Sequence, residues 1–218
     1  LKVFLNGALV TFAQDATIPG TSESLVGMRG TGSGALDNFQ YRAIPPANAQ
    51  LPFSDDFSCA ASGQLASTYV EQMGNVRVAD GSASNNANVT LATLRGVSSQ
   101  GQALSAAVNV AAGSGQAVGL VARYSGPGES NFYLAEVYGK PGMAALQVNL
   151  YLKLSGAYQL LRTATVSPGA HTLRLEVSGT TQKVFVDNAL VLFANDATLT
   201  GAGSAGFRLA GSGASLDQ

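Results

Sequence analysis

The sequence predicts an all-β fold, a two-sheet antiparallel β-sandwich with little helix. Short segments in which apolar and polar residues alternate recur at roughly 8–12-residue spacing, as in sandwich proteins. Clusters of Gly, Asn, Asp, Pro and Ser, the residues that form tight turns, separate these segments. No stretch keeps the helical period of about 3.6 residues over a helical length. We therefore expect strands joined by turns.

The composition permits a packed core and narrows the classes of partner. The chain of 218 residues is 46% hydrophobic and only 11% charged, with a formal net charge of -1. No basic patch is present to neutralise phosphates, so nucleic acid is not expected as a partner. No apolar run reaches the roughly 18–20 residues that cross a bilayer, so no membrane insertion is expected. Cys59, the single cysteine, excludes an internal disulfide.

The first predicted element is a β-hairpin over residues 1–13. Two alternating apolar runs meet at Asn6-Gly7, a pair suited to the positive φ angles of a type I′ turn. Leu25–Arg29 and Ala35–Ala43 are predicted to form two further strands. Residues 44–52 contain adjacent prolines, which disfavour helix, so this stretch is predicted to be an extended linker.

A larger set of predicted strands follows the linker. Turns such as Asp80-Gly81 divide residues 69–95 into several short strands. In Leu146–Leu154 the even positions are apolar and the odd positions polar, which predicts one buried and one wet face. The other expected strands are Ala103–Ala111, Ala117–Tyr124, Asn131–Tyr138, Tyr158–Val166 and Thr172–Ser178, before a hairpin from Val177 to Val184.

The chain contains an internal repeat. Lys2–Gly20 aligns without a gap with Lys183–Gly201, and twelve of the nineteen positions are identical. After a short deletion, Gly27-Met28-Arg29 aligns with Gly206-Phe207-Arg208, and Leu36-Asp37 aligns with Leu216-Asp217. A period this long is typical of an array of whole domains.

The repeat predicts the domain organisation. Residues 1–43 are interpreted as the C-terminal strands of an upstream copy, 44–52 as the linker, and 53–218 as a nearly complete domain that lacks the end of its last strand. Because residues 1–43 have the sequence of the missing part, we expect that a neighbouring molecule can supply it in trans. Neighbouring copies of the same repeat are therefore predicted partners.

Several segments carry a resemblance to a known family. These segments are Asp55-Asp56-Phe57, Val118–Tyr124, Asn131–Leu134, Leu173–Val177 and Leu36–Phe39. They resemble the laminin-G-like, concanavalin A-like lectin/glucanase jelly rolls, most of all those repeated in large bacterial surface proteins. The resemblance implies a jelly roll over residues 53–218 and a location outside the cell or on its surface.

The enzymes of this superfamily carry a strand of the Glu-x-Asp-x-Glu type, which is absent from this sequence. Glu136 stands alone in its strand, and Glu176 is expected to lie close to Arg174 on its own strand and to Lys153 on the adjacent strand. His171 has no Ser or Asp partner nearby in sequence. We therefore expect no catalytic residues and no enzymatic activity.

A glycan-binding face is predicted where an aromatic ring lies among amides and charges, since sugar sites combine these groups. The candidate residues are Tyr151, Asn149, Gln147, Lys153, Arg174 and Glu176. The alternative is a solvated sheet face without a ligand. The absence of Trp favours that alternative, because Trp and Tyr supply most of the flat apolar area of such sites.

A calcium site is the candidate cofactor site. Asp55, Asp56 and Asp217, whose upstream counterpart is Asp37, lie where the first and last strands of such sandwiches run side by side. Carboxylates suit a hard cation. The alternative is that these aspartates cap strand ends and turns.

Together these observations predict a non-catalytic repeat domain of a large secreted or cell-surface bacterial protein, with a role in adhesion or carbohydrate binding. A structural fibre or spacer unit that assembles by strand exchange is the alternative. A glycan-processing enzyme is the third hypothesis.

Overall fold

In the computed structural model, the described residues are 1–218 apart from 14–26, 36, 42–45, 59–62, 86 and 218. The chain divides into two compact units, Leu1–Pro46 and Ala47–Gln218. Cys59 lies outside the described residues. Among the described residues, no helix has the length and apolar character that crossing a membrane requires.

The first unit contains the predicted hairpin. Strands β1 (Lys2–Leu5) and β2 (Ala8–Phe12) pair antiparallel. Asn6 and Gly7 between them have φ angles of 52° and 80°. Positive φ at both central residues is what a type I′ turn requires, so the prediction of this hairpin is confirmed.

The prediction of two further strands in the first unit is wrong for the residues that the structure describes. Residues 27–29, 35 and 37–41 belong to no strand, and the rest of both segments lies outside the described residues. Their counterparts in the second unit pair with strands that are distant in sequence. The described residues of the first unit form only the strands β1 and β2, and a strand without a partner leaves its backbone groups unpaired.

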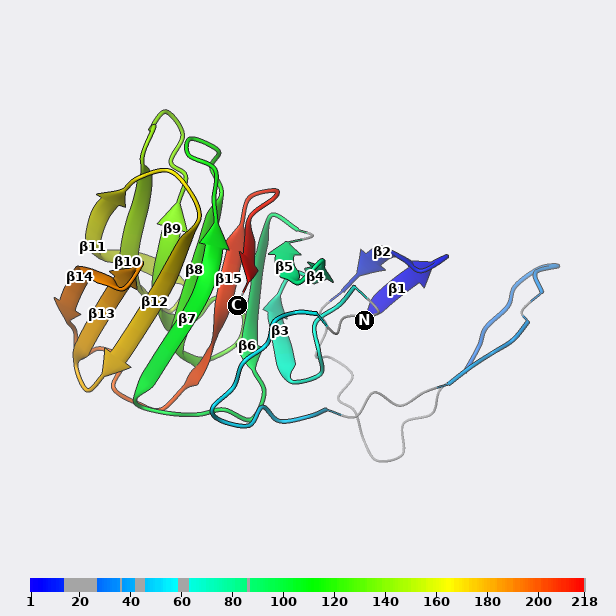
Figure 1. The fold of residues 1–218 in the computed structure, drawn as a ribbon. Helices are drawn as coiled ribbons and strands as arrows, with labels where there is room; N and C mark the ends of the chain where they lie inside the picture. The colour runs from blue at the N-terminus through cyan, green and yellow to red at the C-terminus, as the bar shows by residue number, and fades with distance from the viewer. Residues whose placement is uncertain (14–26, 36, 42–45, 59–62, 86, 218) are drawn as a thin grey trace. The chain divides into compact units, whose positions relative to one another are not determined.

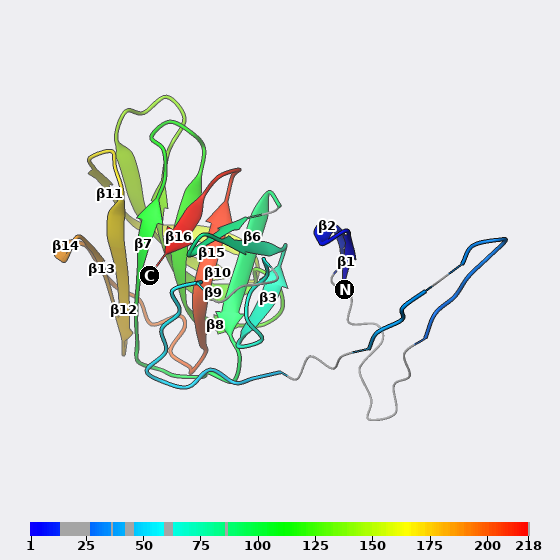
Figure 2. The ribbon, with the colours of Figure 1, turned by 45° about the vertical axis from the view of Figure 1, so that its right-hand side comes forward.

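The second unit is a sandwich of two seven-stranded antiparallel sheets, which confirms the predicted fold class (Figures 1 and 2). The first sheet has the order β11 (Ala157–Val166), β10 (Leu146–Leu154), β9 (Asn131–Tyr138), β8 (Ala117–Ser125), β15 (Ser204–Ala210), β6 (Val89–Leu94) and β3 (Tyr69–Met73). The second sheet has the order β14 (Ala189–Asn195), β13 (Thr181–Val186), β12 (His171–Ser178), β7 (Gln102–Asn109), β16 (Ser215–Asp217), β5 (Ser82–Asn85) and β4 (Val76–Ala79).

The core lies between the sheets. Leu150 and Leu152 of β10 and Leu173 and Leu175 of β12 are buried in one apolar cluster. These residues recur at every second position, as expected for strands with one face turned to the core. Figure 2 shows β7 and β12 in one layer and β6, β8 and β15 in the other.

The strand register brings polar residues into one row across the outer face of the first sheet. Arg208 pairs with Gly119, Gly119 with Glu136, Glu136 with Asn149, and Asn149 with Thr163. Paired residues of neighbouring strands point to the same face. Gly119 has no side chain, and a Cβ there would come within 2.9 Å of the Glu136 Cβ. The lack of a Cβ at Gly119 leaves room for the Arg208 and Glu136 side chains to meet.

Candidate functional site

The candidate site lies on the outer face of the first sheet, where β10 presents Gln147, Asn149, Tyr151 and Lys153. These side chains face away from the core, as the alternation predicted. The face is not fully wet, however, because Asn149 and Lys153 are buried. The prediction of a solvated strand face is therefore corrected. Side chains from other segments, among them Glu129 and Tyr158, cover it.

Glu129, in the turn between β8 and β9, is the centre of the charged network. Its two carboxylate oxygens accept hydrogen bonds from Lys153 Nζ and from Arg208 Nε, the latter at 2.5 Å. The Tyr158 hydroxyl on β11 donates to the same carboxylate at 3.4 Å. Burial raises the pKa of Glu129, but the bonds from Lys153 and Arg208 outweigh it and hold the pKa below its usual range.

Glu136 lies beside this network and is buried. Its Oε2 is 3.9 Å from the Arg208 Nη1, and its Oε1 accepts a hydrogen bond from Asn149 Nδ2 at 3.5 Å. Burial raises the pKa of Glu136, and Arg208 and Asn149 offset only part of that rise. Glu136 is the only charged residue of β9, as the sequence indicated, and its charged partner comes from another strand. Glu129 and Glu136 flank one guanidinium.

Two tyrosines form the aromatic part of the site. The rings of Tyr151 and Tyr158 meet edge to face, with centroids 5.4 Å apart. Lys153 Nζ lies 3.9 Å from the centroid of the Tyr158 ring, which adds a cation–π contact. Tyr151 packs on an apolar cluster of the same face, made of Leu91, Val121, Tyr124, Phe132 and Leu134. Tyr158 is thus held in place, and as a residue it is still exposed to solvent.

Arg174 and Glu176, predicted to belong to this site, lie elsewhere. They pair with each other at 3.0 Å on β12, which is in the second sheet. The predicted contact of Glu176 with Lys153 is wrong for the same reason. Strands that follow each other in sequence often pair, but the chain changes sheets between β11 and β12.

Two of the three predicted calcium ligands, Asp55 and Asp56, accept hydrogen bonds from groups two residues further along the chain. Asp55 Oδ1 accepts a hydrogen bond from the Phe57 N–H at 2.8 Å, and Asp56 Oδ1 accepts from the Ser58 Oγ at 2.6 Å. Asp217 is exposed in β16. Within the described ranges, no three Asp, Glu, His or Cys side chains are grouped so that they could hold a metal ion. The contacts thus favour the alternative of turn-capping aspartates over a calcium site.

Sequence reasoning missed Glu129, Tyr158 and Arg208. One signal was present: Arg208 repeats Arg29 in the aligned upstream segment. Glu129 and Tyr158 gave no signal, because nothing local shows that a turn and an edge strand cover β10.

No family model matches the chain. No curated protein matches it either.

Solved structures do match the fold. The carbohydrate-binding module CBM66 from Bacillus subtilis is 17% identical, with a TM-score of 0.58 over 69% of this chain and 91% of that one. The Crh5 transglycosylase in complex with NAG is 16% identical, with a TM-score of 0.53 over 80% of this chain and 73% of that one. The Bacillus licheniformis beta-glucanase is 14% identical, with a TM-score of 0.50 over 75% of this chain and 93% of that one.

These comparisons correct the prediction that the domain is not an enzyme. That prediction rested on a missing sequence pattern, yet two of these three similar structures are named as enzymes. The architecture is therefore compatible with catalysis as well as with binding. At these identities the likeness concerns the fold alone. The second unit of this chain has the concanavalin A-like jelly-roll fold of the lectin and glucanase type.

Proposed function

We propose that this chain is a carbohydrate-binding domain whose ligand lies on the outer face of the first sheet, against Tyr158. The observation that carries the proposal is that the exposed Tyr158 lies beside a network of polar side chains that are hydrogen-bonded to one another and largely buried. Tyr158 contacts Tyr151, Lys153 and Glu129, and each of these contacts limits how the ring can move. Carbohydrate-binding modules among the solved structures of this fold support the proposal.

The chemistry of the face suits a sugar. A pyranose ring offers a flat apolar face to an aromatic ring and hydroxyls that exchange hydrogen bonds at its rim. Tyr158 supplies the ring, and half-buried Gln147 and exposed Thr163 supply donors and acceptors on neighbouring strands. The two cations, Lys153 and Arg208, lie against two carboxylates, Glu129 and Glu136, so the network carries no net charge when both carboxylates are ionised. We therefore infer a neutral oligosaccharide rather than an anionic one.

The wider setting belongs to the same proposal. We infer that the domain acts as a repeat of a large secreted or bacterial cell-surface protein, in adhesion to glycans. The internal sequence repeat and the low charge support this inference. Secretion of the full-length protein, detected in the culture medium or by surface labelling of intact cells, tests it. Retention inside the cells contradicts it.

The binding proposal is tested with Tyr158→Ala. Laminari-oligosaccharides, N-acetylglucosamine oligomers and a wider panel of neutral glycans are titrated into the full chain by calorimetry. We expect the ligand that binds best to lose about fivefold in affinity, because a stacking ring contributes about 1 kcal/mol. Phe193→Ala on β14 is the matched control, because Phe193 is 46% exposed and Tyr158 43%. Equal affinities of the two variants, or no binding by any glycan, contradict the proposal.

A second candidate function is a glycan-cleaving reaction, favoured by Glu129 and Glu136 on either side of Arg208. Glycosidases use two carboxyl groups, one of which stays protonated to act as the acid. Glu136, whose pKa burial raises, has the character of that acid. Release of reducing ends from the bound glycan, abolished by Glu136→Gln while binding persists, supports this function. No release by the unmodified chain contradicts it and leaves the binding proposal unaffected.

A further inference from the structure

The outer face of the second sheet carries apolar side chains along the hairpin β13–β14. Leu190 and Phe193 of β14 are 53% and 46% exposed. They pair with Phe185 and Lys183 of β13, which alternate with residues of the core and therefore point outward. Clustered apolar side chains on a surface mark candidate contact sites for other proteins.

The first unit carries the same outward set. Lys2, Phe4, Leu9 and Phe12 align with Lys183, Phe185, Leu190 and Phe193, and they pair in the same way. Within the strands of the two hairpins, the two positions that differ are Leu5 and Thr11, whose counterparts Val186 and Leu192 lie in the core. Substitutions are normally tolerated better on a surface than in a core. The identical outward set therefore indicates that a partner contacts it.

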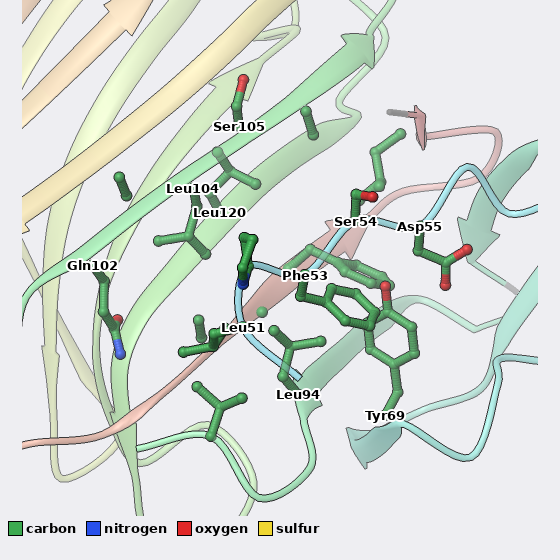
Figure 3. Close-up of a pocket in the computed structure, with 18 of the residues that line it drawn as sticks. Leu51, Phe53, Ser54, Asp55, Tyr69, Leu94, Gln102, Leu104, Ser105 and Leu120 are labelled. Atoms are coloured by element: carbon green, nitrogen blue, oxygen red, sulfur yellow. The ribbon is translucent and has the colours of Figure 1, made fainter. Parts of the chain in front are cut away.

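The register extends this face across two more strands. Leu104 of β7 packs on the core, and Figure 3 shows it among the residues around a pocket. Its neighbours Ala103 and Ser105 are exposed and face outward. Ala103 pairs with Glu176 of β12, and Ser105 pairs with Arg174. Because both β12 residues also pair with β13, each outward row crosses four strands.

The first row is complementary to its own reverse. From β14 to β7 it contains Phe193, Lys183, Glu176 and Ala103. If an identical row faces it in the opposite order, Lys183 lies opposite a carboxylate and Glu176 lies opposite an ammonium group. The largest side chain, Phe193, then lies opposite the smallest, Ala103. The row therefore matches its reverse in charge and in size.

The second row has the same property. It contains Leu190, Phe185, Arg174 and Ser105. In the opposite order, Leu190 lies opposite the small Ser105, and Phe185 lies opposite a guanidinium. Within one chain the Arg174 guanidinium carbon lies 3.9 Å from the centroid of the Phe185 ring, so these two groups are compatible neighbours on this face.

We propose that two copies of this chain associate through these faces, related by a twofold axis that runs parallel to the strands between β12 and β13. Such an axis reverses the order of the strands in the facing sheet and keeps each row opposite itself. Lys183 of each copy then lies opposite Glu176 of the other copy. The contact is isologous, so every pair occurs twice. The two facing sheets pack as the layers of a sandwich do.

The contact is expected to be weak. Four strands about 4.8 Å apart span only about 19 Å, which corresponds to a small, transient interface. Weak contacts gain avidity when several are linked. The presence of the outward set in both units of the chain fits an association that is strengthened by repetition.

Sedimentation equilibrium of the full chain over about a thousandfold range of concentration tests the proposal, since association follows mass action. We expect monomers at the lowest concentration and dimers at the highest. Leu190→Ser is expected to weaken the dimer about tenfold, because the interface loses one leucine from each copy. The control is Leu160→Ser on β11 of the first sheet, because Leu160 is 50% exposed and Leu190 53%. A monomer at every concentration, or equal dimerisation of the two variants, overturns the proposal.

Exchange of the charges locates the axis. Lys183→Glu and Glu176→Lys each place like charges opposite one another twice, so each variant alone is expected to remain monomeric. Mixed in equal amounts, the two variants place opposite charges in both contacts and are expected to form mixed dimers. A damaged fold cannot produce this rescue, because mixing does not restore the pairs within either chain. Dimers of either variant alone, or the absence of mixed dimers, overturn the assigned faces.

Discussion

The hairpins β1–β2 and β13–β14 have the same backbone pairing but differ in how far their side chains are buried. Lys2 pairs with Phe12 as Lys183 pairs with Phe193, and each ladder skips one residue at the equivalent place. In both turns the two central residues have positive φ angles, at Asn6-Gly7 and at Asp187-Asn188. Their burial differs, however, because Val3 is 52% exposed whereas its counterpart Val184 is 0% exposed.

The comparison separates local from tertiary causes. Turn chemistry and alternation are properties of about a dozen consecutive residues, and they are sufficient to give both hairpins the same register. Burial of Val184 needs β12, which pairs with β13 and places the hairpin in the second sheet. A two-stranded hairpin without such a neighbour is marginal in water. The stability of each copy is therefore expected to depend on packing rather than on its own sequence.

The largest expected effect comes from placing a charge at the buried Val184, compared with the same change at its exposed counterpart Val3. We predict that Val184→Asp lowers the free energy of unfolding of the second unit by about 3–5 kcal/mol, because it buries an unpaired carboxylate. Val3→Asp is predicted to change it by less than about 0.5 kcal/mol, as at an exposed site. Urea denaturation followed by circular dichroism measures both. Equal losses at the two sites would break the comparison.

A smaller effect is expected at the turns. Asn188 has a φ of 66°, a conformation that Ala adopts only at a cost. We predict that Asn188→Ala lowers the unfolding free energy of the second unit by about 1 kcal/mol, whereas Asn188→Gly does not lower it. Gly7→Ala, at the equivalent turn position, is predicted to leave the unfolding of the second unit unchanged. Thermal denaturation of the three variants provides the measurement.

The smallest effect concerns pH. His171 Nδ1 is 2.7 Å from Asp187 Oδ2, and its Nε2 is 2.9 Å from the Ser167 carbonyl oxygen. Partial burial lowers the pKa of His171, but the bonds to Asp187 and Ser167 outweigh it and the net shift is upward. The hydrogen bonds from His171 and from the Thr172 N–H hold the pKa of Asp187 below its usual value. The sequence offered no nearby carboxylate partner for His171, and the structure supplies one 16 residues away, Asp187.

The direction of these shifts sets the pH dependence. A raised pKa means that protonated His171 adds stability below its ordinary pKa, and that this contribution is lost as the pH rises through the raised value. The Asp187 contribution is lost as the pH falls through its lowered pKa. Asp187→Asn introduces the type of residue found at Asn6 of the first copy. We predict that Asp187→Asn lowers the pKa of His171. The variant is also expected to lack the gain in unfolding free energy that protonated His171 gives at acidic pH.

Nuclear magnetic resonance titration measures this directly, because His171 is the only histidine of the chain. Thr172→Ser, which leaves the Asp187 carboxylate in place, is the control. An unchanged His171 titration in Asp187→Asn would show that Asp187 does not set the pKa.

Much of the sandwich was predictable from the sequence. The predicted strands Asn131–Tyr138 and Leu146–Leu154 have the bounds of β9 and β10. The alternation in β10 also identified correctly which side chains face the core. This success has a simple reason: alternation is written in consecutive residues, so no knowledge of the partner strand is needed.

The candidate site was only partly predictable. Tyr151, Asn149, Gln147 and Lys153 share one strand, and the alternation placed them on one face. Glu129, Tyr158 and Arg208 come from a turn, an edge strand and a central strand, and only strand order and register bring them together. Arg174 and Glu176 show the opposite error, since they are near in sequence but lie on the other sheet.

By itself, the sequence determined the turns, the strands and the face of each strand that is apolar. It also determined that two segments of the chain are versions of one hairpin. Only the tertiary structure decided which strands pair, whether a hairpin is covered, and which polar side chains meet over Gly119. The physical reason is that a pattern with a period of two encodes the direction of a side chain but not the identity of the neighbouring strand.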